Sequence, residues 1–186
     1  MIARLLFWLA LATALPAMAQ QLPKLDVSVK RVDTEDMKVF EVAATGSVAA
    51  APATVWKILT DYERMPDFVP DMQMSHVLSR NGNHVVVEQF GVARFLFIKR
   101  DIHLVVQVIE QPMSMIDIGL ITGDMKLYNC RWELVPIPET GGTRILYSGR
   151  LSPRFYVPGM LGSNLIRSDI EHMMSAVLDR LDRGGN

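Results

Sequence analysis

The chain has few of the residues that common catalytic and structural sites require. It contains one cysteine, Cys130, so no internal disulfide can form. Its four histidines are never spaced as a metal-binding pair such as H-x-x-x-H. The sequence also lacks a phosphate-binding glycine loop, a dinucleotide fingerprint and a G-x-S-x-G nucleophile motif. The sequence therefore predicts no metal site, no cofactor and no identifiable catalytic residue.

An excess of charge of one sign is missing as well. The 19 lysines and arginines are matched by 20 aspartates and glutamates, and the formal net charge at pH 7 is −1. A domain that binds nucleic acid through its overall electrostatic field carries a clear basic excess. We therefore expect no nucleic-acid partner.

The apolar run near the N-terminus is too short to span a bilayer. LLFWLALATAL falls well short of the roughly 20 residues that a transmembrane helix needs. Arg4 precedes this run, and AMA at Ala17 to Ala19 has the small-x-small form of a cleavage site. The pattern predicts a signal peptide over residues 1–19 and a protein exported to the periplasm. An uncleaved N-terminal anchor is the alternative interpretation.

The start of the mature chain divides into a leader and a domain. Residues 20–37 are polar and irregular, and they predict a leader with at most one short strand. Residues 38–183 form the predicted domain, which begins with an alternating, β-branched strand at 39–48. Pro52 is well placed to start a helix, and Pro66 and Pro70 prevent a long one. Two short helices are therefore expected after the first strand.

The rest of the domain predicts strands followed by one long helix. Alternating runs separated by the turns RNGN, TGD and PETGGT indicate a series of antiparallel strands. From about residue 160 an apolar stripe with helical spacing indicates a long amphipathic C-terminal helix. We expect an α+β fold in which a curved antiparallel sheet of about seven strands wraps around this helix. A curled sheet of this kind leaves a space between its two layers.

Two stretches of the sequence carry a family resemblance. They are SVAAAPATVWKILTDYERMPDFVPDM and QMSHVLSRNGNHVVVEQF. Together with the element order over about residues 38–183, they resemble the helix-grip fold of the START-like superfamily. The similarity is greatest to its coenzyme Q-binding and polyketide cyclase/dehydrase branch. The resemblance implies a hydrophobic cavity under the long helix, where family members hold quinones, lipids, sterols or polyketides. Some of those proteins are enzymes, and many only bind.

Candidate ligand-binding residues lie on the inferred inner faces of the strands, on the helix and at the corner between the short helices. Aromatic side chains with a hydroxyl or an indole N–H are suited to orienting a ligand in an apolar cavity, although ordinary core packing also explains them. A register shift of one residue would exchange the two faces of a strand. The candidates are Tyr62, Phe68, Gln89, Ile98, Arg100, Tyr128, Trp132, Tyr147, Met173 and Met174.

Two charged residues have competing interpretations. Arg100 shares its strand face with Ile102 and Leu104, which would point it into the cavity. It either binds a polar ligand group, or the strand bends and the side chain extends to solvent. Asp61 precedes Tyr62, and we expect its carboxylate to cap the second short helix. The alternative for Asp61 is an acid at the cavity mouth.

Three functions remain open from the sequence. The first is an exported binding protein for a hydrophobic small molecule such as a lipid, a quinone or a polyketide-like aromatic, with transient membrane contact. The second is a cyclase or dehydratase acting in the same cavity, for which Arg100, Tyr128, Tyr147 and His172 are the candidate residues. The third is a protein-interaction module with a filled core. The missing catalytic motifs favour the binding protein.

Overall fold

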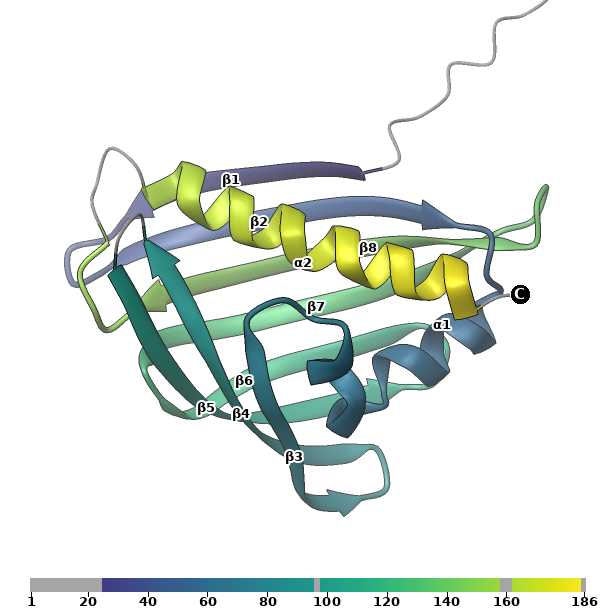
Figure 1. Cartoon of the computed structure of the whole chain (residues 1–186), viewed down its shortest axis with the longest axis horizontal. Coiled ribbons are helices and arrows are strands. Elements are labelled where there is room, and N and C mark those ends of the chain that lie inside the picture. The colour runs from purple at the N-terminus through teal and green to yellow at the C-terminus, as the bar shows by residue number, and fades with distance from the viewer. Residues whose placement is uncertain (1–24, 96–97, 158–161, 185–186) are drawn as a thin grey trace, which may run out of the picture.

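The computed structural model describes residues 25–95, 98–157 and 162–184, except the side chains of Phe95 and Ile98. The predicted signal peptide at 1–19 lies outside these residues. An eight-stranded sheet forms one layer, and helices cover its concave side (Figure 1). The elements are β1 (Leu25–Asp33), β2 (Lys38–Val48), α1 (Pro52–Leu59), η1 (Tyr62–Asp67), β3 (Met72–Asn81), β4 (His84–Phe95), β5 (Ile98–Gln111), β6 (Met115–Gly123), β7 (Met125–Ile137), β8 (Gly142–Pro153) and α2 (Gly162–Gly184).

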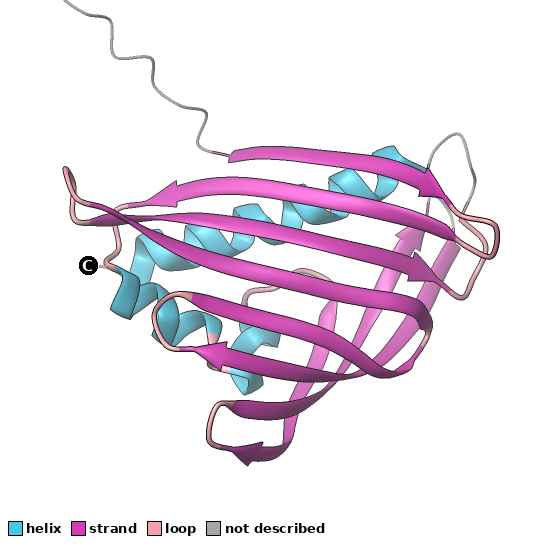
Figure 2. Cartoon of the chain, turned by 180° about the vertical axis from the view of Figure 1, so that it is seen from behind, coloured by secondary structure: helices cyan, strands magenta, loops and turns pink. Residues whose placement is uncertain are grey.

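The sheet is antiparallel throughout, with the strand order β1-β2-β8-β7-β6-β5-β4-β3. β2 pairs with β8, so the second strand and the last strand in the sequence lie side by side. Seen from behind, the strands form one continuous curved layer in front of the helices (Figure 2). The predicted helix-grip fold is confirmed, with eight strands instead of about seven.

The additional strand is β1, in the segment interpreted as a leader. Its sequence LDVSVKRVD alternates, and it pairs with β2 from Leu25 opposite Gly46 to Asp33 opposite Lys38. Val27 is buried beneath α2, which contacts β1 directly. An edge strand needs only one buried face, so polar residues alternate with the apolar ones in β1. These polar residues made the segment look irregular in the sequence. The folded domain therefore begins by Leu25, earlier than the predicted Lys38.

The two short helices occur where the prolines predicted them. α1 starts at Pro52 and buries Val55 and Leu59. η1 is a 3₁₀ helix that comes directly after it. Asp61 occupies the N-cap position of η1, but its exposed side chain makes no capping hydrogen bond. The predicted carboxylate cap is wrong because the Asp61 carbonyl accepts from Arg64 N at 3.1 Å, so backbone already satisfies that donor.

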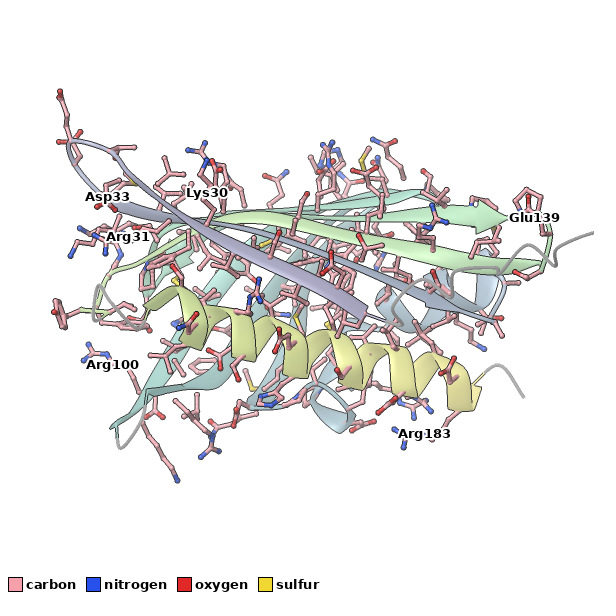
Figure 3. The ribbon with its side chains drawn as sticks, turned by 90° about the horizontal axis from the view of Figure 1, so that it is seen from above. Lys30, Arg31, Asp33, Arg100, Glu139 and Arg183 are labelled. Atoms are coloured by element: carbon pink, nitrogen blue, oxygen red, sulfur yellow. The ribbon has the colours of Figure 1, made fainter. Side chains whose placement is uncertain are left out.

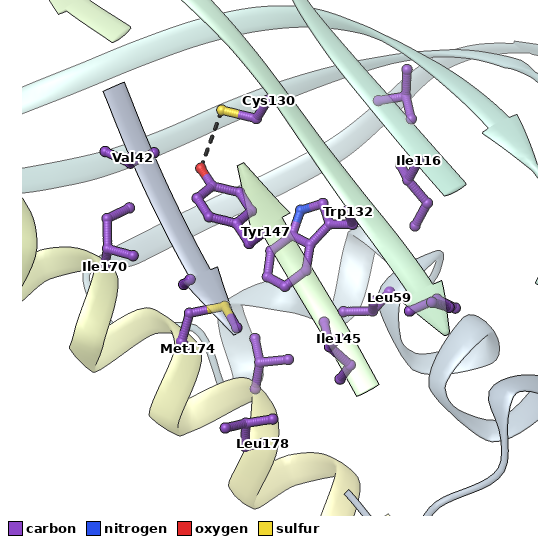
Figure 4. Close-up of a cluster of buried hydrophobic side chains, with 14 of the residues drawn as sticks. Val42, Leu59, Ile116, Cys130, Trp132, Ile145, Tyr147, Ile170, Met174 and Leu178 are labelled. Carbon is purple, nitrogen blue, oxygen red and sulfur yellow. Dashed lines mark hydrogen bonds between the residues drawn. The ribbon is translucent and has the colours of Figure 1, made fainter. Parts of the chain in front are cut away.

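The long helix packs one stripe of apolar residues against the sheet (Figure 4). Gly46 of β2 lets the helix approach closely, since a Cβ there would lie 2.7 Å from Leu178 Cδ1. Met174 and Leu181 are fully buried. The buried apolar residues of α2 are Ile166, Ile170, Met174, Val177, Leu178 and Leu181. This packing covers the β1–β2 side of the sheet.

Candidate functional site

A cavity of about 250 Å³ opens between α2 and the β4–β5 side of the sheet. One wall comes from the connection between η1 and β3, and another from α2 between Asp169 and Met173. Most of its lining side chains are apolar, and the polar ones are few. The lining residues are Val69, Pro70, Asp71, Met72, Gln89, Phe90, Gly91, Val92, Ala93, Ile102, Leu104, Tyr128, Asp169, Ile170, His172 and Met173.

A smaller pocket of about 60 Å³ continues this cavity toward the core. The two share the wall residues Val69, Met72, Gln89, Tyr128 and Met173. The inner pocket alone holds little more than a few water molecules. Together the two volumes reach the lower end of the range for small-molecule sites, about 300 Å³. The two pockets are therefore adjacent and share one wall, with the larger pocket at the mouth and the smaller one at the inner end.

Most of the predicted cavity residues meet at the inner end, although they come from six different elements or connections. Met174 is an exception, because it is fully buried between α2 and the sheet and lines neither volume. The side chain of Ile98 lies outside the described residues. The predicted residues that line the inner pocket are Tyr62, Phe68, Gln89, Tyr128, Trp132, Tyr147 and Met173.

Arg100 does not line the cavity. Its side chain is exposed, and its guanidinium carbon lies 5.6 Å from the centre of the Phe155 ring. Leu104 and Val106 share its strand face and are buried, so the assignment of faces was right. Figure 3 places Arg100 at one end of the molecule, at the margin of the side-chain layer. Arg100 lies near the start of β5, before the strand reaches the core, so the interpretation as a charge in the cavity is wrong and the side chain extends to solvent.

Hydroxyl and thiol groups gather at the inner end of the cavity. Tyr147 Oη donates a hydrogen bond to Cys130 Sγ at 3.1 Å (Figure 4). The ring centres of Trp132 and Tyr147 lie 4.7 Å apart at an angle of 54°. Burial, followed by the nearby Cys130, raises the Tyr147 pKa well above its ordinary value. The Tyr128 pKa is raised mainly by Cys130 and then by burial. Both hydroxyls therefore stay protonated and act as neutral hydrogen-bonding groups.

Cys130 is expected to resist thiol reagents while the protein is folded. Burial raises the pKa of its thiol to about 11, and only 5% of the residue is exposed. The thiolate that reacts is therefore scarce and shielded. We expect iodoacetamide to label the native protein at least tenfold more slowly at about pH 8 than the urea-unfolded protein, since an unperturbed thiol has a pKa of about 8.5. Mass spectrometry of timed samples measures both rates, and equal rates would contradict the burial of Cys130.

A second polar group near the inner end was not found from the sequence. Glu110 is only 8% exposed and accepts a hydrogen bond from Tyr62 Oη at 2.8 Å. Arg80 Nη1 donates to both of its carboxylate oxygens, at 2.9 and 3.1 Å. Burial and then the Glu110 hydrogen bond raise the pKa of Tyr62. This network fastens η1 to β3 and β5. The available signal was that Glu110 shares a strand face with the buried Val106 and Val108.

The cavity mouth carries charged groups that the sequence analysis did not select. Arg94 Nε donates to Asp71 Oδ1 at 2.6 Å, which pairs that carboxylate. Asp169 lies on the opposite wall and retains solvent exposure. Its pKa is raised to about 6, mainly by partial burial and then by the charge of Asp71, while His172 opposes the shift. No local pattern marks these residues, because they come from segments about 80 to 100 positions apart that only the fold brings together.

Neither a metal site nor a membrane span emerges from the described residues. Within 25–95, 98–157 and 162–184, no cluster of three histidine, cysteine or acidic side chains is arranged to hold a metal ion. No helix in those ranges combines the length and the apolar character that crossing a bilayer requires.

Solved structures with the same fold come from several bacteria. A START superfamily protein from Mycobacterium smegmatis is 20% identical, with a TM-score of 0.67, over 77% of this chain and 97% of its own. An aromatase/cyclase from a Streptomyces species is 14% identical, with a TM-score of 0.65, over 79% and 93%. A STAR-related lipid transfer protein from Xanthomonas axonopodis is 18% identical, with a TM-score of 0.63, over 83% and 98%. At such identities the likeness shows the fold alone.

The sequence itself shows the family. No curated protein matches the chain. The profile of the family described as polyketide cyclase/dehydrase and lipid transport matches residues 48–178, which run from the end of β2 to the buried face of α2. The matched region includes the short helices α1 and η1 and every residue that lines the cavity. This chain therefore belongs to the polyketide cyclase/dehydrase and lipid transport family.

Proposed function

We propose that this protein binds a hydrophobic small molecule in the cavity beneath α2. The observation that carries the proposal is the pair of adjacent apolar pockets between Met173 and the β4–β5 side of the sheet. Ligand sites are typically concave and apolar, with a few polar groups that fix orientation. Gln89, Tyr128 and Tyr147 supply such groups at the inner end. A lipid, a quinone or a polyketide-like aromatic would each present the required apolar surface.

A cyclase or dehydratase in the same cavity is the second candidate, and the family contains such enzymes. The geometry supports it less well. Arg100 lies outside the cavity, so it cannot contact a substrate there. Tyr128 and Tyr147 have raised pKa values, which makes them poor bases at neutral pH. His172 lines the mouth of the cavity. Among the described residues, the inner pocket has no histidine or carboxylate that could act with it as an acid or a base. Binding without turnover therefore has the stronger support.

A filled core, as an interaction module requires, has the least support. The core residues under the C-terminal half of α2 are tightly packed, with Val177, Leu178 and Leu181 almost fully buried. The opposite is true one to two turns earlier, where Asp169 and Met173 border an open volume. An open apolar volume of this size departs from the close packing of a filled core.

Native mass spectrometry of protein purified from its own host tests the proposal. We expect a bound small molecule at one copy per chain, released on unfolding. In parallel, an uncharged apolar fluorescent probe such as N-phenyl-1-naphthylamine should bind saturably and be displaced by long-chain alcohols. Recovery without ligand, together with no saturable binding and no thermal shift by alcohols, fatty acids, quinones or sterols, would refute the proposal.

A further inference from the structure

We propose that the cavity prefers amphipathic ligands whose polar end is cationic, such as a primary alkylamine, over those that end in a carboxylate or phosphate. The inference rests on the proposed function and deepens it by assigning the charge of the ligand head group.

The charged residues of the cavity lie at its mouth. Asp71 and Asp169 contribute carboxylates from facing walls, and His172 lies one turn along α2 from Asp169. The described lining includes no lysine and no arginine. The inner pocket offers only neutral polar groups, from Gln89 and the tyrosines. Since a charge is costly to bury without a partner, the charged end of a ligand must remain at the mouth.

The two carboxylates at the mouth are not equivalent. Asp71 is already paired with Arg94 at 2.6 Å, so these two charges largely cancel. The Asp169 carboxylate has no hydrogen bond or ion pair to another side chain of the described residues. His172 opposes the rise of the Asp169 pKa only in part. When Asp169 is ionised, the charges of Asp71, Arg94 and Asp169 sum to an excess of one negative charge at the mouth.

A cationic ligand group would stabilise the ionised form of Asp169. Partial burial and the like charge of Asp71 raise its pKa to about 6, so this carboxylate lacks a compensating partner. An ammonium group beside Asp169 supplies that partner. A carboxylate or phosphate would add a further negative charge between Asp71 and Asp169, where repulsion opposes binding. The Arg94 guanidinium offers little relief, because it does not line the cavity and its charge is offset by Asp71.

Three competing ligands with the same alkyl chain test the inference. Decylamine, decanol and decanoate are titrated against the fluorescent apolar probe at about pH 8, where a carboxyl with a pKa of about 6 is ionised. We expect the amine to bind most tightly and decanoate most weakly, with about a three- to tenfold difference for one partly exposed charge pair. In Asp169→Asn, the difference between amine and decanoate should shrink to less than about twofold.

Asp179→Asn is the matched control. Asp179 is exposed on the same helix and does not line the cavity, so this variant should keep the wild-type order. Equal binding of the three decyl ligands overturns the head-group inference while the proposed function stands. A preference for the amine over decanoate that Asp169→Asn leaves intact does the same. Failure of decanol to displace the probe overturns both. Circular dichroism of each variant confirms that the comparison is between folded proteins.

Discussion

Met173→Trp is expected to weaken the binding of apolar ligands at least tenfold. Met173 lies on α2 where the outer cavity and the inner pocket meet, and it lines both. Its flexible thioether can move aside, whereas a rigid indole would occupy the junction and close the inner end. Losing the inner contacts removes apolar surface from the bound ligand, and tenfold corresponds to only about 1.4 kcal/mol. Probe displacement by decanol measures the change.

A tryptophan at Leu165 separates blocking of the cavity from a general effect on α2. Leu165 is half-buried on the same helix and lines neither part of the cavity. We expect Leu165→Trp to bind decanol within about twofold of the wild type, a difference of less than about 0.5 kcal/mol. If Met173→Trp folds and binds as the wild type does, the ligand does not pass this junction, and the cavity is not the binding site.

Glu110→Ala is expected to lower the free energy of unfolding by about 2–4 kcal/mol. The substitution removes the acceptor of the Tyr62 hydroxyl, which is buried with 3% exposure. It also leaves the Arg80 guanidinium without its carboxylate. Arg80 is 43% exposed and can turn to water, so the loss should stay below that for a fully buried pair. Urea denaturation followed by circular dichroism measures it.

Two further substitutions define the origin of that loss. Asp117→Ala breaks the Arg131–Asp117 pair, whose Nε–Oδ1 distance is 2.6 Å and whose side chains are 46% and 30% exposed. An exposed pair of this kind is worth about 0–1 kcal/mol. Glu110→Gln keeps an acceptor for Tyr62 and should fall between the wild type and Glu110→Ala. A loss for Glu110→Ala no larger than that for Asp117→Ala would show that the buried network does not stabilise the fold.

The fold could be predicted from the sequence because its signals are local. Alternating residues identified the strands, and Pro52, Pro66 and Pro70 identified two short helices. The stripe of α2 was assigned from its helical spacing, and the residues predicted at Ile166, Ile170 and Val177 are buried. β1 was underestimated because an edge strand that buries one face carries a weaker pattern.

For the site, the sequence could predict only which strand residues lie on the concave face of the sheet. Face assignment correctly placed Tyr128, Trp132 and Tyr147 on the concave side. It placed Arg100 on the same side, but it could not show that β5 has not yet reached the core at that point. The signal peptide at residues 1–19 lies outside the described structure, so export stays a prediction.

By itself the sequence determined the elements from β2 onward and their order, because backbone periodicity and proline geometry act within a few residues. Tertiary structure alone decided which polar groups meet. Tyr62 reaches Glu110 across 48 positions, and Asp169 faces Asp71 from the far end of the chain. Such encounters depend on how strongly the sheet curls and where α2 crosses it, and these are set by the packing of the whole core.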